Sequence, residues 1–161
     1  MNVTIRLISP ADGIAVANII RTVMPEFGAG GAGFAIHDTE VDNMYQAYSD
    51  PSCAYYVCEV DGKVIGGGGI APLQGGSAEY CELKKMYFLS EGRGLGLGYK
   101  TLQACIQAAQ EIGYIYCYLE TFNTMDHAMH LYEKAGFKKI EGPLGNTGHF
   151  ACDRFYLLKL K

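Results

Sequence analysis

The sequence has no excess of basic residues: 13 Lys and Arg stand against 17 Asp and Glu, for a net charge of −4. Because a negative chain is repelled by phosphate backbones and anionic lipids, we expect neither a nucleic acid nor a membrane as partner. No apolar run is long enough to cross a bilayer, and residues 1–6 lack the basic and apolar parts of a secretory signal. These absences predict a cytoplasmic protein.

The sequence also lacks a Cys-x-x-Cys pair, an internal repeat, a low-complexity segment and a linker. Its six cysteines lie mostly in apolar runs, which predicts buried and reduced thiols. With 49% hydrophobic and 19% charged residues, the 161-residue chain can bury a substantial core. We therefore expect a single domain that spans residues 1–161.

Hydrophobic periodicity and turn residues predict helices interleaved with antiparallel hairpins, which is an α+β fold with a mixed sheet. Strands are expected at residues 3–8, 53–60, 63–70, 81–89, 114–121, 137–140 and 151–160. Helices are expected at about residues 10–24, 39–48, 95–111 and 125–135. Pro25 should end the first helix, and Leu95 should lie on the buried face of the third. Four consecutive glycines at 66–69 should mark a bulge or a close neighbour in their strand.

A glycine-rich turn, Ser90 to Gly98, joins the strand at 81–89 to the helix that follows it. Glycine lets the backbone adopt positive φ angles and approach a ligand closely. The first N–H groups of a helix have no partner and carry partial positive charge, and Arg93 adds a full charge. The turn therefore predicts a phosphate-binding loop, with an ordinary strand-to-helix turn as the alternative.

Three phosphate-loop patterns can be compared with this turn. The Walker pattern needs Gly-Lys-Ser/Thr, whereas here Gly98 is followed by Tyr99 and Lys100. The dinucleotide pattern needs G-x-G-x-x-G early in the chain, and the glycine spacing does not match it. The third pattern, Q/R-x-x-G-x-G/A, fits Glu91-Gly92-Arg93-Gly94-Leu95-Gly96, apart from Glu91 at its first position. This segment resembles the acyl-CoA loop of the GNAT N-acetyltransferases.

A second motif, Leu131-Tyr132-Glu133-Lys134-Ala135-Gly136-Phe137, resembles the helix of that family whose tyrosine faces the coenzyme sulfur. The resemblance implies a GNAT-like fold, with a mostly antiparallel sheet of about seven strands flanked by about four helices. It also implies acetyl-CoA as co-substrate. The contacts expected for acetyl-CoA are Met86, Tyr87, Phe88, Arg93, Gly94, Leu95, Gly96, Leu97, Gly98, Asn123 and Tyr132. Many members carry an asparagine where this chain has Met125; Asn123 lies nearby, with a turn role as its alternative.

Acyl transfer to an amine needs a base, because a protonated amine is not a nucleophile, and an acid for the departing thiolate. A carboxylate in an apolar strand is costly to bury without a purpose. Glu82 is therefore the candidate base, with a salt bridge to Lys84 or Lys85 as the alternative, and Glu120 is the second candidate. The resemblance implies that Tyr132 is the acid; the alternative is that Tyr132 is only a buried aromatic residue. The resemblance also implies that a backbone N–H of the strand at 81–89 donates a hydrogen bond to the carbonyl oxygen.

Acceptor binding is expected in two loop-rich regions of the chain. His149 and Asp153 lie at the start of the last strand and, with Glu120, are the predicted substrate-binding residues; Arg154 offers a partner for a carboxylate. The glycine-rich segment 27–34 predicts either a mobile loop or a lid over the acceptor.

A metal site and a cysteine nucleophile are two other possibilities, and the sequence favours neither. His127 and His130 are spaced i, i+3 on a helix but lack a third ligand, so we expect no metal. No histidine is paired by motif with Cys81, Cys117 or Cys152, so direct transfer is expected in preference to a cysteine nucleophile.

The sequence therefore predicts an N-acetyltransferase that moves the acetyl group of acetyl-CoA directly to a primary amine of a small molecule. Two alternatives stay open: a protein or peptide N-acetyltransferase, and a non-catalytic acyl-CoA-binding sensor. A homodimer also stays open beside a monomer.

Overall fold

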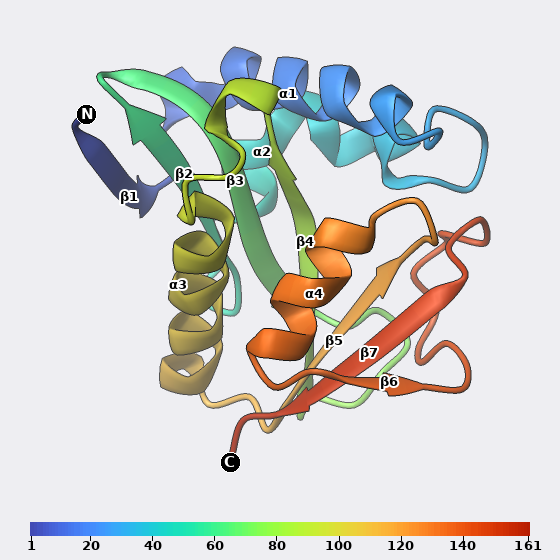
Figure 1. Cartoon of the computed structure of the whole chain (residues 1–161). Helices are drawn as coiled ribbons and strands as arrows, with labels where there is room; N and C mark the ends of the chain where they lie inside the picture. Colours follow the sequence, from blue (N-terminus) through green and yellow to red (C-terminus); the bar gives the residue numbers. More distant parts are fainter.

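The computed structural model describes residues 1–161 and places seven strands in one sheet of order β1-β2-β3-β4-β5-β7-β6 (Figure 1). The strands are β1 Val3–Leu7, β2 Ala54–Val60, β3 Lys63–Pro72, β4 Tyr80–Phe88, β5 Tyr116–Thr121, β6 Lys138–Ile140 and β7 Arg154–Lys159. The helices are α1 Gly13–Glu26, α2 Met44–Ala47, α3 Leu97–Ile112 and α4 Asp126–Lys134. All neighbouring strands are antiparallel except β4 and β5, which are parallel. The predicted α+β architecture is confirmed.

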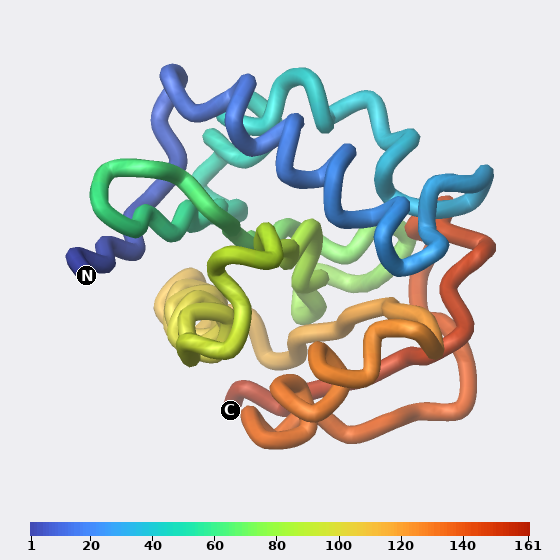
Figure 2. The backbone as a smooth tube through the Cα atoms, turned by 45° about the horizontal axis from the view of Figure 1, so that its top comes forward, coloured from blue at the N-terminus to red at the C-terminus, as the bar shows by residue number.

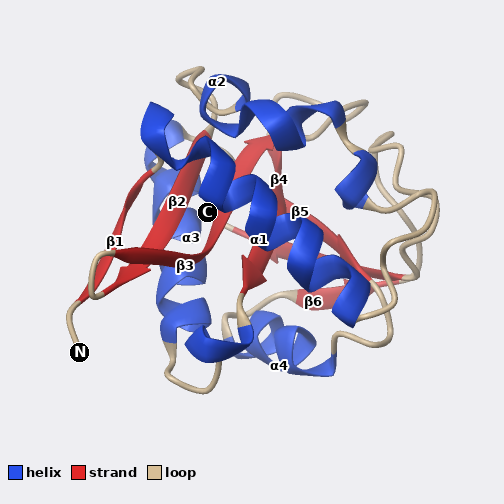
Figure 3. Ribbon diagram, turned by 90° about the horizontal axis from the view of Figure 1, so that it is seen from above, coloured by secondary structure: helices blue, strands red, loops and turns tan.

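Helices cover both faces of the sheet (Figure 3). On one face α1 and α2 bury side chains such as Ile20 and Met44 in a shared apolar cluster. On the other face α3 and α4 contribute Leu102, Cys105 and Tyr132 to a second cluster. The apolar stripes of the helices and the apolar residues of the strands thus form two cores, separated by the sheet.

The middle strand β4 has a bulge at Lys85, whose φ is 53°. Opposite this position the register with β3 shifts between Gly67 and Gly69. A bulge adds one residue to a strand and thereby reverses the alternation of side chains beyond it. As a result Lys84 and Lys85, although adjacent, both reach Glu40 on the same side of the sheet.

The glycines of β3 make room for side chains at the end of β4, as predicted. A Cβ atom at Gly66 would collide with the Phe88 ring, and one at Gly68 would collide with Met86 Sδ. A larger residue at either position of β3 would therefore displace the side chain of Phe88 or Met86. Met86 and Phe88 go on to line the site described below.

Strands β4 and β5 separate from each other soon after they pair. Only residues Tyr80–Glu82 of β4 pair with β5, where they face Tyr116–Tyr118 in parallel. Beyond Glu82, side chains from both strands line a cavity instead of forming further strand pairs. Figure 2 shows α4 (orange) beside the yellow-green turn that enters α3, and the side chain of Leu131 lies next to Gly98.

Two predictions about helix ends were wrong. Pro25 does not end α1 but lies inside its last turn, because Met24 is buried against the sheet and its packing outweighs the steric preference of the proline. Leu95 precedes α3 and is 46% exposed. The helix starts later because Gly96, with φ of 75°, forms its N-cap.

The last strand begins at Arg154, later than predicted, because the Cys152 N–H bonds back to the His149 carbonyl in a turn. The prediction of buried free thiols holds for Cys58, Cys81, Cys105 and Cys117. No helix combines the length and the apolar character needed to span a bilayer.

Candidate active site

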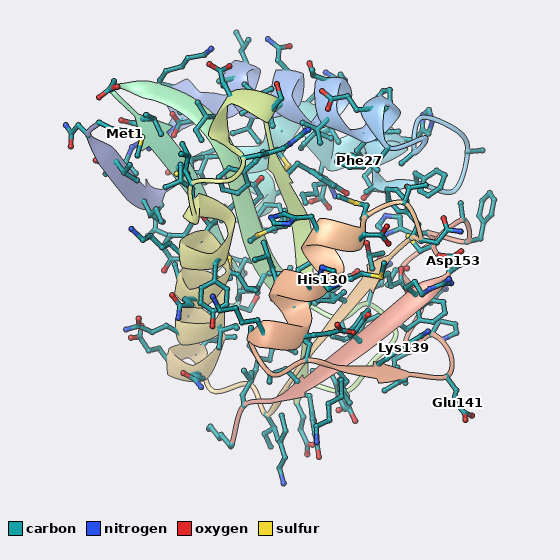
Figure 4. The ribbon with its side chains drawn as sticks, in the orientation of Figure 1. Met1, Phe27, His130, Lys139, Glu141 and Asp153 are labelled. Carbon is teal, nitrogen blue, oxygen red and sulfur yellow. The ribbon has the colours of Figure 1, made fainter.

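A cavity of about 520 Å³ lies between the glycine turn, the end of β4 and α4. Phe27, which follows α1 and is labelled in Figure 4, closes one side of it. Its lining residues are Val23, Phe27, Met86, Tyr87, Phe88, Gly92, Arg93, Gly94, Gly96, Leu97, Gly98, Tyr99, Met125, His127, Ala128, Leu131, Tyr132 and Lys134. Most of the predicted cofactor residues are therefore brought together around one space.

The glycine turn presents backbone to this cavity. Gly94 and Gly96 have φ of 77° and 75°, a conformation that favours glycine. No side chain caps the start of α3, so its first N–H groups are left without partners at the cavity wall. Together with the helix dipole, these N–H groups can bind the phosphates of a cofactor.

Arg93 is fixed beside the turn by three contacts. Its Nε donates to the Phe88 carbonyl at 3.0 Å, and its guanidinium pairs with Glu26 at 3.0 Å and lies 5.2 Å from the centre of the Phe27 ring. Glu91, the residue that departs from the family pattern, instead pairs with Lys63 at 3.0 Å. The carboxylate of Glu91 is thus held by a lysine and does not line the large cavity.

A second, smaller cavity of about 40 Å³ adjoins the first. It has room for about three water-sized atoms. Met86, Tyr87, Met125 and Tyr132 line both cavities and form the boundary between them. Glu82, Glu120, His149 and Cys152 line the smaller cavity, together with Met24, Phe34, Ala35, Leu83, Lys84, Lys85, Leu119, Thr121 and Phe122.

Glu82 faces the small cavity without a hydrogen bond or an ion pair, and it is only 4% exposed. Burial raises the pKa of its carboxyl to about 7; the charge of Lys84 lowers that pKa and the charge of Glu120 raises it. The alternative of a salt bridge to Lys84 or Lys85 is not formed, because both lysines bind other carboxylates. Glu82 is therefore a free carboxylate that can take up a proton near neutral pH.

A chain of charges runs along the wall of the small cavity. Lys85, whose side chain is fully buried, lies 2.7 Å from Asp38 and 3.2 Å from Glu40, and Lys84 lies 3.1 Å from Glu40. His149 Nε2 lies 2.8 Å from Asp38. Burial by itself would raise the pKa of Asp38, but His149 and Lys85 outweigh it and hold the pKa at about 2. Asp38 therefore stays ionised and fixes the orientation of the His149 ring.

Glu120 faces His149 from β5. The hydroxyls of Tyr118 and Thr147 donate to its two oxygens, and His149 Nδ1 lies 3.7 Å from it. Ligand atoms of Glu82, Glu120 and His149 all lie within 4.8 Å of one another, so this trio could hold a metal ion. His127 and His130, on which the expectation of no metal was based, are not part of this trio. The absence of a metal therefore stays a prediction.

Tyr132 projects from α4 to the boundary of the two cavities and is 7% exposed. Its ring packs against Phe137 and Tyr156. Its hydroxyl makes no hydrogen bond within the protein, unlike that of Tyr156, which donates to Glu133. Burial raises the pKa of Tyr132 well above its usual value, so the hydroxyl stays protonated.

Three predicted residues do not line either cavity: Leu95, Asn123 and Asp153. Asp153 lies at the outer edge of the molecule (Figure 4) and pairs with its neighbour Arg154 at 3.3 Å. The Asp153 N–H bonds to the Thr121 carbonyl, which fixes this segment beside the end of β5.

Sequence reasoning missed that Lys84 and Lys85 bind Asp38 and Glu40. A signal was present, since two lysines inside an apolar strand need buried acidic partners. Asp38 and Glu40 are two carboxylates close together in the sequence, as the two lysines are. Nothing in the sequence, however, showed that the segment with Asp38 and Glu40 lies next to the strand with Lys84 and Lys85.

Comparison with known proteins shows the family of this chain. The model of the acetyltransferase (GNAT) family matches residues 17–137. The N-acetyltransferase YjgM of Escherichia coli K12 is 44% identical over 149 residues, which is 92% of this chain and 89% of that protein. An N-acetyltransferase of Schizosaccharomyces pombe is 31% identical over 124 residues, covering 76% of this chain and 74% of its own.

Solved structures show the same fold. A GNAT-family acetyltransferase of Staphylococcus aureus Mu50 superposes with a TM-score of 0.86 at 21% identity, covering 99% of this chain and 100% of that one. The structure of yncA from Salmonella typhimurium, which contains acetyl-CoA, gives a TM-score of 0.78 at 22% identity. The match covers 100% of this chain and 95% of that one. With the family model matching most of the sequence, this chain belongs to the GNAT family of acetyltransferases.

Proposed function

We propose that this protein transfers the acetyl group of acetyl-CoA directly to the primary amine of a small molecule. The observation that carries the proposal is the pair of adjoining cavities, with a free buried carboxylate in the small one and a protonated tyrosine at their boundary. This arrangement supports catalysis over a purely cofactor-sensing role, because a sensor needs neither a base nor an acid.

The large cavity would hold acetyl-CoA. The free N–H groups at Gly96–Gly98 and the charge of Arg93 would bind phosphates, and the exposed edge of β4 at Met86–Phe88 would lie along the pantetheine arm. Solved structures of the same fold support acetyl-CoA as the co-substrate: the yncA structure contains acetyl-CoA, and that of an aminoglycoside 6'-N-acetyltransferase contains coenzyme A.

The residues of the small cavity would carry the chemistry. Glu82 removes a proton from the acceptor ammonium, and the free amine then attacks the thioester carbonyl. An N–H of β4 beyond the last pair with β5 stabilises the charge on the carbonyl oxygen. The carbon–sulfur bond breaks, and the Tyr132 hydroxyl donates its proton to the departing thiolate. The acetylated nitrogen loses its second proton, which restores the Tyr132 hydroxyl, and Glu82 releases its proton to solvent.

Direct transfer is favoured over an acetylated cysteine. Cys152 is the cysteine that lines the small cavity. Burial, together with the charges of Glu120 and Glu82, raises the pKa of its thiol to about 12. A protonated thiol is a poor nucleophile, so Cys152 is unsuited to accept the acetyl group.

The enclosure of the small cavity supports a small acceptor over a peptide. Phe34 and Ala35 close it from one loop and His149 and Cys152 from another, which leaves room for the reacting end of a molecule only.

The test is release of free thiol from acetyl-CoA in the presence of primary amines, with short peptides and lysine-containing proteins as the comparison set. We expect turnover with one or more small amines and little with peptides. Binding of acetyl-CoA without amine-dependent thiol release would contradict the proposal in favour of a sensor. Turnover with peptides alone would assign the acceptor to the protein class.

A further inference from the structure

We infer that the acceptor is a primary amine on an unbranched carbon chain that carries no carboxylate beside the amino group, such as an alkylamine or an arylalkylamine. This inference rests on the proposed function and narrows it: amines of this class are preferred over the amino acids that share their carbon skeleton.

The charges around the small cavity favour a cation. Glu82 and Glu120 line the cavity, and Asp38 and Glu40 lie beside it, where they pair with Lys84 and Lys85. Four carboxylates thus stand against two lysines. Glu82 is more than nine-tenths buried, has no partner in the protein and faces the cavity. A buried carboxylate without a partner is costly, and an entering ammonium group supplies the missing partner.

No cation that lines the small cavity is left to bind an acceptor carboxylate. Lys84 and Lys85 are held by Asp38 and Glu40, and His149 Nε2 is held by Asp38. Arg154, which the sequence offered for this purpose, pairs with Asp153 at the start of β7 and does not line the cavity. A carboxylate placed beside the amino group would thus meet Glu82 and Glu120 without a counter-charge.

The rest of the wall suits hydrocarbon. The rings of Phe34 and Phe122 pack edge to face with centres 5.1 Å apart, and Met24 and Met125 lie beside them. The cavity volume of about 40 Å³ admits roughly three non-hydrogen atoms. An amino group and the methylenes next to it fill that space against these apolar side chains, and the rest of the molecule would extend out of the cavity.

The experiment compares tyramine, tyrosinamide and tyrosine as acceptors at one pH, with rates corrected for the pKa of each amine. The three differ only in a hydrogen, a neutral amide or a carboxylate on the same carbon. We expect kcat/KM for tyramine to exceed that for tyrosine by about 100-fold, since unmatched like charges are strongly disfavoured at a binding site. Tyrosinamide should lie closer to tyramine, because it has the bulk of tyrosine without its charge. Pentylamine and norleucine give the same comparison without a ring.

A variant separates charge from shape. Glu120→Gln removes one cavity carboxylate at nearly constant size, so the tyramine-to-tyrosine ratio should fall by about tenfold. Glu141→Gln, at an exposed site beyond β6 (Figure 4), should leave the ratio unchanged. Tyrosine acetylated as fast as tyramine, or tyrosinamide as slow as tyrosine, would overturn the inference and leave the proposed function intact. Absence of thiol release with every amine would overturn both.

Discussion

The large cavity takes much of its wall from one continuous stretch, residues 86–99, whereas the small cavity takes its wall from segments far apart in the sequence. In the large cavity the reactive surface is backbone, presented by glycines and by the uncapped start of α3. In the small cavity it consists of side chains, and charged groups from β4, β5 and two loops hold one another in place.

This difference matches what each cavity recognises in the proposed function. Phosphates and a pantetheine arm offer groups that backbone N–H donors can bind whatever the side chains are. An acceptor is distinguished by its charge and size, and only side chains placed around it can read these features. The same fold can therefore keep one cavity fixed while the other varies.

The largest effect is expected where the two cavities meet. Tyr132→Phe should lower kcat by about 10²–10⁴-fold with little change in the Kd for acetyl-CoA, because the hydroxyl acts when the thiolate departs. Tyr156→Phe is the matched control: its ring packs on Tyr132, but its hydroxyl binds Glu133 outside the cavities. Steady-state kinetics and calorimetry measure the two quantities. Full activity of Tyr132→Phe would make Tyr132 a packing residue and move the proton donor elsewhere.

A smaller loss, about 100-fold in kcat/KM, is expected for Glu82→Gln in the small cavity. The carboxyl of Glu82 has its pKa raised to about 7, and the base must be ionised. Activity of the unaltered protein should therefore rise as pH increases through about 7 and fall as the carboxyl is protonated below it.

The Gln side chain has no such titration, so the acidic limb of the pH profile should disappear in Glu82→Gln and persist in Glu120→Gln. Retention of the limb in Glu82→Gln, with nearly normal rates, would assign the base to another group.

The smallest effect concerns the backbone of the large cavity. Gly94→Ala should raise the Kd for acetyl-CoA about tenfold, because a Cβ at φ of 77° disfavours the conformation that presents the turn. Gly113→Ala introduces comparable strain at the end of α3, with φ of 110° and open space around it, but far from the cavity. Calorimetry should give an unchanged Kd for that control. Equal weakening in both variants would mean that the loss reflects general destabilisation.

The part of the site that follows from local sequence could be predicted. A strand followed by glycines and a helix predicts the turn at 90–98, and the resemblance of residues 131–137 to a GNAT motif implied the position of Tyr132. The fold class followed from hydrophobic periodicity. These features depend on residues that are neighbours in the chain, so they can be predicted from the sequence.

The small cavity could be predicted only in part. Glu82, Glu120 and His149 were identified as separate candidates, but their meeting depends on the divergence of β4 and β5. The pairing of Lys84 and Lys85 with one acidic segment depends on the bulge, which puts two adjacent residues on the same face. A period-2 pattern assigns them to opposite faces. Asp153 illustrates the converse, since a polar residue near His149 in sequence lies outside the cavity.

The chain of charges on Asp38, Glu40, Lys84 and Lys85 also constrains how this enzyme can evolve. Neutralising Lys85 alone would leave two carboxylates in a half-buried site without their shared, fully buried partner, and this type of change costs about 3–5 kcal/mol. A single substitution in this chain of charges would thus remove a large part of the free energy of unfolding that is typical of a domain. Directed evolution should reach new specificities through paired substitutions, one near Asp38 and Glu40 and one in β4. Otherwise it should do so only after stabilising changes elsewhere have raised the free energy of unfolding.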